Sequence, residues 1–153
     1  MKRNSPTETD LFQARRILTE KDQSLVIVRD GETLFTSAES GVSPLIRVID
    51  LLGFHLRGSA AADRIVGKAG AFLLVFSGVS SVYGETMTEE AKRLLDMAGI
   101  LAEPGRIVPH IWNRAHDGVC PFEQALQGCT DPADAYARVC VVTGKKTKEA
   151  GCD

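Results

Sequence analysis

The chain has 153 residues, of which 44% are hydrophobic and 25% charged, and its formal net charge is -2. This length fits a single domain, and this composition excludes a disordered or fibrous chain and gives no indication of a surface that binds nucleic acid or membrane. The most apolar segment, residues 69–76, is far shorter than the ~18 residues needed to cross a bilayer, and the N-terminus has no apolar segment of the signal-peptide type. We therefore expect a cytoplasmic protein. Its four cysteines form no C-x-x-C pair and are expected to be reduced: Cys120, Cys129, Cys140 and Cys152.

The N-terminal part predicts a helix followed by a hairpin. Residues 1–9 are polar and are expected to be disordered, and Asp10 can cap a helix over residues 11–20. The segment 24–37 carries two β-rich runs on either side of an Asp-Gly pair at 30–31, which is a strong signal for a two-residue turn. We expect these two runs to form an antiparallel hairpin.

Two buried helices are predicted next. The first covers residues 43–52, because Ser43 can act as its cap and Pro44 suits the first helical position. The second lies within residues 58–79 and ends at Gly78, and its apolar half leaves no polar stripe to face water. We expect this second helix to lie in the middle of the domain.

Strands and helices alternate in the rest of the chain. The predicted elements are a strand over 81–85, a helix from Thr88 to Gly99, a strand over 100–102, an extended segment over 106–111, a short helix over 122–127 and a last helix from Asp131 to about Val142. This order predicts a three-layer α/β/α sandwich with a mixed sheet of about four to five strands. One domain over 10–143 would be followed by a solvated tail, 144–153.

A cluster of charges in the segment 58–79 is the first candidate site. In the predicted helix, Asp63, Arg64 and Lys68 lie in the first turns, where free N–H groups and the positive end of the dipole favour an anion. Gly67 and Gly70 would form a smooth strip that lets a ligand approach the backbone. The alternative is that Asp63 only complements the helix dipole while the basic pair is solvated.

The second candidate site is the polar loop 113–118 and the cysteine after it. Cys120 precedes a predicted helix start, where the dipole lowers a thiol pKa, and His110 or His116 could act as a base. The alternative is an inert buried thiol. Glu123 in the first turn stabilises that helix in either case. The two histidines and Cys120 match no common zinc spacing, so no metal site is predicted.

The sequence resembles a known family. The stretches SLVIVRDGETLFTS, SPLIRVIDLL, GSAAADRIVGKAGAFLLVFSGVSSVYGE and IVPHIWNRAHDGVCPFE together are similar to the domain-of-unknown-function family numbered 1893, over about residues 25–136. The resemblance implies a cytidine-deaminase-like α/β/α fold of undetermined activity. Zinc-dependent deaminases carry H-x-E or C-x-E at one helix start and P-C-x-x-C at another.

The zinc motifs of deaminases are absent from the positions compared with them. These positions read Ala62-Asp63-Arg64 and, in the segment 87–91, MTEEA, while the Cys120-Pro121 order is reversed. Without zinc no activated water is available at neutral pH, so zinc-dependent deamination is not expected and no cofactor is predicted.

Three functional hypotheses follow. The first is a non-catalytic binder of a nucleotide-like or other anionic small molecule. Its ligand-binding residues would be Asp63, Arg64, Gly67 and Lys68 on one side of a pocket and Asn113, Arg114, Asp117, Cys120 and Glu123 on the other. The second is a metal-independent enzyme with Cys120 as nucleophile, and the third is a regulatory subunit that forms homo-oligomers. In the second, Asp63 or a histidine would assist Cys120. Convergence of the Asp63 and Cys120 stretches on one pocket would support a binding site.

Overall fold

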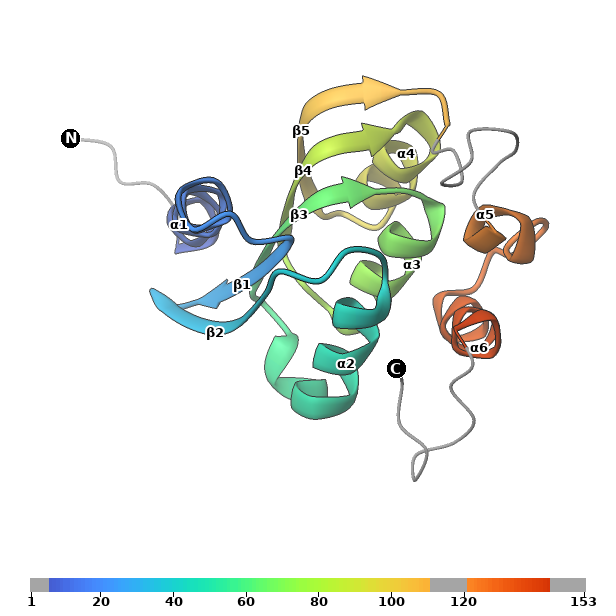
Figure 1. Ribbon diagram of the computed structural model, residues 1–153, viewed down its shortest axis with the longest axis horizontal. Helices are drawn as coiled ribbons and strands as arrows, with labels where there is room; N and C mark the ends of the chain where they lie inside the picture. The colour runs from blue at the N-terminus through green and yellow to red at the C-terminus, as the bar shows by residue number, and fades with distance from the viewer. Residues whose placement is uncertain (1–5, 111–120, 144–153) are drawn as a thin grey trace.

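The computed structural model describes residues 6–110 and 121–143. Five strands form one mixed sheet with the order β2-β1-β3-β4-β5, and helices cover both of its faces (Figure 1). The strands are β1 (Leu25–Arg29), β2 (Glu32–Ser37), β3 (Ala60–Val66), β4 (Ser81–Thr88) and β5 (Leu101–Val108). The helices are α1 (Pro6–Glu20), α2 (Ser43–Leu52), η1 (Gly53–Leu56), α3 (Lys68–Ser77), α4 (Glu89–Met97), α5 (Pro121–Ala125) and α6 (Pro132–Val142). The predicted three-layer α/β architecture is confirmed.

The predicted hairpin of β1 and β2 is confirmed, and Asp10 of α1 stabilises its turn. Asp30 and Gly31 occupy the turn with positive φ angles of 51° and 79°. The Asp10 carboxylate accepts hydrogen bonds from both turn amides, at 2.8 Å from Asp30 N and 2.9 Å from Gly31 N. Asp10 therefore does not cap α1, which begins at Pro6 and not at residue 11. The prediction missed this because the partner amides lie 20 residues away in the sequence.

The prediction of one central helix over residues 58–79 is wrong. Residues 60–66 form β3, which pairs antiparallel with β1 and parallel with β4, and α3 begins only at Lys68. The alanines at 60–62 favour a helix in isolation. Their small side chains also let β3 pack closely on both faces, and strand pairing on both sides outweighs the local preference. The positions compared with the first zinc motif therefore lie in a strand.

The last two strands are longer than predicted. β4 continues to Thr88, and β5 runs without a break through Pro104 and Gly105, where the sequence predicted a gap between the segments 100–102 and 106–111. Proline is tolerated here because β5 is an edge strand. Gly105 is required by space, since a Cβ there would lie 2.7 Å from the Glu85 carbonyl oxygen.

Several predicted helix ends agree with the structure. The Thr88 side chain accepts from the Ala91 amide at 3.1 Å, and the Asp131 side chain accepts from the Asp134 amide at 3.0 Å. Gly78 ends α3 in the left-handed conformation. Two predicted boundaries differ slightly from the structure. The cap position of α2 is Val42 in place of Ser43, and α5 spans residues 121–125 in place of 122–127.

Two apolar cores lie on the two faces of the sheet. Helix α1 covers one face, where Leu18 packs against Val26 and Ala62. Helices α2, α3 and α4 cover the other face, and α5 and α6 lie against α3 on its outer side (Figure 1). None of the described helices is long and apolar enough to cross a membrane.

Candidate functional site

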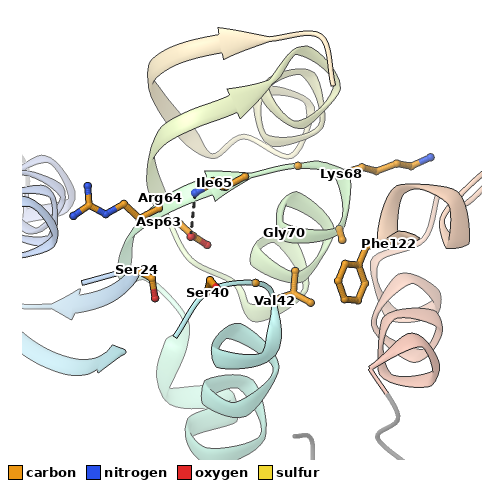
Figure 2. A pocket seen from close by; sticks show the side chains of 12 residues that line it. Ser24, Ser40, Val42, Asp63, Arg64, Ile65, Lys68, Gly70 and Phe122 are labelled. Atoms are coloured by element: carbon orange, nitrogen blue, oxygen red, sulfur yellow. Dashed lines mark hydrogen bonds between the residues drawn. The ribbon is translucent and has the colours of Figure 1, made fainter. Parts of the chain in front are cut away.

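A cavity of about 230 Å³ opens where β3 ends and α3 begins (Figure 2). Its walls come from four further parts of the chain besides β3, so no single segment of sequence encodes it. The contributing residues are Ser24, the loop residues 40–42 before α2, residues 63–65 of β3, residues 67–70 at the start of α3, and Phe122 of α5. Most of the lining surface is apolar.

Asp63 is the acidic side chain of this cavity. Its carboxyl group extends from β3 toward the loop that carries Ser40 (Figure 2). Burial raises the pKa of Asp63 to about 7, although backbone N–H groups of Ile65 and Arg64 act in the opposite direction. The Ile65 amide donates to Oδ1 at 3.4 Å. Asp63 forms no ion pair with any residue in the described ranges, so its charge is not neutralised there.

Arg64 lies on the same strand but serves another purpose. Its side chain points toward α1, away from Asp63 (Figure 2). The guanidinium donates to the Leu18 carbonyl at 3.1 Å, to the Gln23 carbonyl at 2.9 Å and to Glu85 Oε2 at 2.7 Å. A further bond of 3.1 Å reaches the Asp22 carboxylate. Arg64 therefore fastens the C-terminal end of α1 to the sheet.

Lys68 also turns away from Asp63. Only 11% of its side chain is exposed, and its Nζ lies 3.6 Å from Glu90 Oε2 on α4. It borders a second, open and more polar hollow of about 1070 Å³, whose lining includes Arg93 and His110. Both basic residues predicted to bind an anion next to Asp63 thus direct their charges to acidic residues of the protein.

The first turn of α3 lines the first cavity. Gly67 occupies the cap position without a side-chain cap, and the first hydrogen bond across the helix start joins Ala71 N to Gly67 O at 2.9 Å. The N–H groups of Lys68, Ala69 and Gly70 precede that bond and have no intrahelical acceptor.

The second half of the predicted site falls mostly outside the described residues. This holds for Asn113, Arg114, Asp117 and Cys120, for His116, and for the side chain of Glu123. Phe122, which follows Cys120 by two positions in the sequence, lines the same cavity as Asp63. Phe122 therefore brings the second stretch to the cavity of Asp63 in the part of the chain that the structure describes. The roles of the other residues of that stretch stay predictions.

Several lining residues could not be predicted from the sequence. Ser24, Val42 and Ile65 have no motif around them, and they become neighbours only through the pairing of β1 with β3 and the position of α2. For metal binding, no group of three or more His, Cys, Asp or Glu side chains in the described ranges is arranged to hold an ion.

The fold and the cavity define an α/β protein with a small site at the junction of a central strand and a buried helix. Residues 13–141 match the family model described as TM1506, domain of unknown function (DUF1893), and the chain belongs to this family. No curated protein matches the chain. It is similar to the crystal structure of a DUF1893 family protein (TM1506) from Thermotoga maritima at 2.70 Å resolution. The TM-score is 0.79 with 24% identity, over 95% of this chain and 97% of that chain.

These comparisons confirm the family resemblance that the sequence indicated. At 24% identity the structural likeness concerns the fold alone. The deaminase-like part of the prediction is not tested by it and stays a prediction.

Proposed function

We propose that this protein binds a small molecule in the cavity beside Asp63, without catalysing a reaction on it. The observation that carries the proposal is a carboxyl group without a counter-ion that extends into a mainly apolar cavity. Pockets that combine an apolar lining with a few convergent polar groups are the usual form of ligand sites.

The size of the cavity supports a compact ligand. Its volume of about 230 Å³ lies below the range of roughly 300–1,000 Å³ typical of pockets for drug-sized molecules. A single ring or a short branched molecule matches this space. Val42, Ile65 and Phe122 would contact its apolar body, while Asp63 would face its polar edge.

The charges change one part of the sequence-based hypothesis. An anionic ligand was expected because Arg64 and Lys68 were placed beside Asp63 on one helix. In the folded chain Arg64 bonds to Glu85 and Lys68 approaches Glu90, so the charged group that remains at the cavity is an acid. A nucleotide-like ligand would therefore place its ring, and not its phosphate, next to Asp63.

A second candidate function is acid–base catalysis by Asp63. A carboxyl pKa near 7 matches the working pH of a group that both accepts and returns protons, and such pKa values are frequent in active sites. The alternative enzyme with Cys120 as nucleophile depends on a residue outside the described ranges. That alternative, homo-oligomer formation and a cytoplasmic location stay predictions.

A cavity-filling variant tests the proposed binding. A fragment panel of single-ring compounds would be screened by thermal shift against the native protein, Val42→Phe and Val141→Phe. Val42 lines the cavity, whereas Val141 on α6 is 76% exposed and serves as the control for the same substitution. A ligand at a hundred times its Kd stabilises the native protein by about 2.7 kcal/mol. We expect hits that Val42→Phe loses and Val141→Phe keeps, and a panel without hits would contradict the proposal.

A further inference from the structure

We infer that the ligand of this cavity carries a positively charged N–H group that pairs with Asp63, on a small planar ring such as an aryl amidine or an aminoheterocycle. The inference rests on the proposed function and names the chemical class of its ligand. It stands on the charges that line the cavity, on the contacts of the carboxylate and on the shape of the apolar wall.

The charge balance around the cavity is the first argument. Three ionisable residues line it, and the two basic ones have partners outside it. Arg64 NH1 lies 2.7 Å from Glu85 Oε2, and Lys68 Nζ lies 3.6 Å from Glu90 Oε2. The carboxylate of Asp63 has no such partner in the described ranges. A cation would supply the missing opposite charge beside this half-buried carboxylate.

The contacts of the carboxylate are the second argument. The amides of Ile65 and Arg64 belong to its own strand and are neutral donors, and the Ile65 contact is long at 3.4 Å. A carboxylate offers about four acceptor positions, so most of them remain for a ligand. Two parallel N–H groups, as in an amidine, match the two oxygens of one carboxylate.

The composition of the cavity wall is the third argument, because it favours an organic cation over a metal ion as the ligand. Calcium takes about six to eight oxygen ligands, and magnesium takes an octahedral set of oxygens and waters. Here one carboxylate lies among mainly apolar atoms of Val42, Ile65 and Phe122. Figure 2 shows the Phe122 ring beside Val42 and Gly70 at the far end of the cavity from Asp63. A flat ring with a charged end would contact both parts at once.

Three probes of nearly equal shape test the inference. Benzamidine is a cation, benzamide is neutral and benzoate is an anion at pH 8. Their Kd values would be measured by NMR titration for the native protein, Asp63→Asn and Asp96→Asn. Asp96 lies on α4, pairs with Lys92 and does not line the cavity, so it controls for the loss of one charge.

We expect benzamidine to bind at least about tenfold more tightly than benzamide, a difference of about 1.4 kcal/mol, and benzoate to bind more weakly than either. Asp63→Asn should remove this preference and Asp96→Asn should keep it. A preference for benzoate, or a preference for benzamidine that survives Asp63→Asn, would overturn the inference while the proposed binding stands. If no single-ring compound of any charge binds, the proposed function itself fails.

A second measurement does not depend on a variant. The ¹³C resonance of the Asp63 carboxyl group would be followed against pH with and without saturating benzamidine. A bound cation favours the ionised carboxylate and lowers its apparent pKa. An unchanged midpoint, with the probe bound, would show that the cation does not contact Asp63 and would overturn the inference.

Discussion

Asp63 and Arg64 are consecutive residues of β3, and their side chains leave the sheet on opposite faces. Asp63 extends into the cavity next to α3, and Arg64 reaches across to the end of α1 (Figure 2). Alternation along a strand is the reason, because successive side chains point to opposite sides. Of these two adjacent charged residues, Asp63 therefore faces the cavity, and Arg64 links α1 to the sheet.

The stability of the protein should depend on pH through Asp63. Its pKa is higher in the folded chain, about 7, than its ordinary value of 3.8. The folded chain thus keeps a proton that the unfolded chain releases between these values. The contribution of this group to the free energy of unfolding falls as the pH rises from about 4 to about 7, by about 1.4 kcal/mol for each unit of the pKa shift. Above about pH 7 the contribution is constant.

Urea unfolding of the native protein and Asp63→Asn at pH 5 and pH 8 measures this effect. The variant should be more stable than the native protein at pH 8, and the difference should shrink at pH 5. The nearby charged groups are Arg64 on β3, Lys68 on α3, Glu85 on β4 and Glu39 before α2, and all are ion-paired. A difference that is the same at both pH values would contradict the raised pKa.

Removal of the Arg64 side chain should loosen α1. Arg64→Ala deletes four hydrogen bonds, to Leu18, Asp22, Gln23 and Glu85. Hydrogen bonds to charged groups contribute more than neutral ones, so we expect a loss of roughly 2–3 kcal/mol in the free energy of unfolding. Arg47→Ala is the control, because its exposed pair with Glu39 should contribute less than about 1 kcal/mol. Equal effects of the two variants would argue against this role of Arg64.

Asp10→Ala should destabilise the hairpin turn. Asp10 is 3% exposed, and its carboxylate accepts from the Asp30 and Gly31 amides. The variant leaves both donors without that acceptor, which should cost about 2 kcal/mol. Amide hydrogen exchange at residues 30 and 31 should accelerate as well. If the exchange rates of both amides stay as in the native protein, the carboxylate does not hold the turn in solution.

Gly105→Ala should destabilise the edge of the sheet. The new Cβ would lie 2.7 Å from the Glu85 carbonyl oxygen and 2.9 Å from the Tyr83 hydroxyl, so the two strands would have to separate. Overpacking of this kind costs about 1–3 kcal/mol. Gly70→Ala is the matched control, since its Cβ would meet only Val66 at 3.7 Å and alanine favours the helix. A thermal melt of both variants measures the contrast, and equal melting temperatures would contradict it.

Local signals in the sequence predicted much of the fold. The Asp30-Gly31 turn, the Thr88 and Asp131 caps and the end of α3 at Gly78 each depend on a few neighbouring residues, and the structure agrees at all of them. The strand β3 was missed because alanine favours a helix when only neighbours in sequence are considered. Its pairing with β1 and β4 involves residues about 20 to 40 positions away, which local rules do not include.

The sequence predicted several residues of the candidate site correctly, but it did not predict how they are arranged. Asp63, Arg64, Gly67 and Lys68 do line the cavity, but the prediction placed the three charged residues in the first turns of one helix and therefore expected an anion. The strand reverses that expectation, because alternation directs the Arg64 side chain to the face opposite to that of Asp63. Val42 and Phe122 had no signal at all, since their contact with the cavity depends on how separate helices are placed around α3.

The place of Asp63 within the sheet has a consequence for recognition. β3 is paired on both sides, so the backbone that carries the carboxylate is fixed before any ligand arrives. Binding then requires little ordering of the protein on this side, and preorganisation of that kind reduces the entropic cost of association. The affinity and selectivity of the site would then depend mainly on the free energy of removing water from the carboxylate and from the ligand.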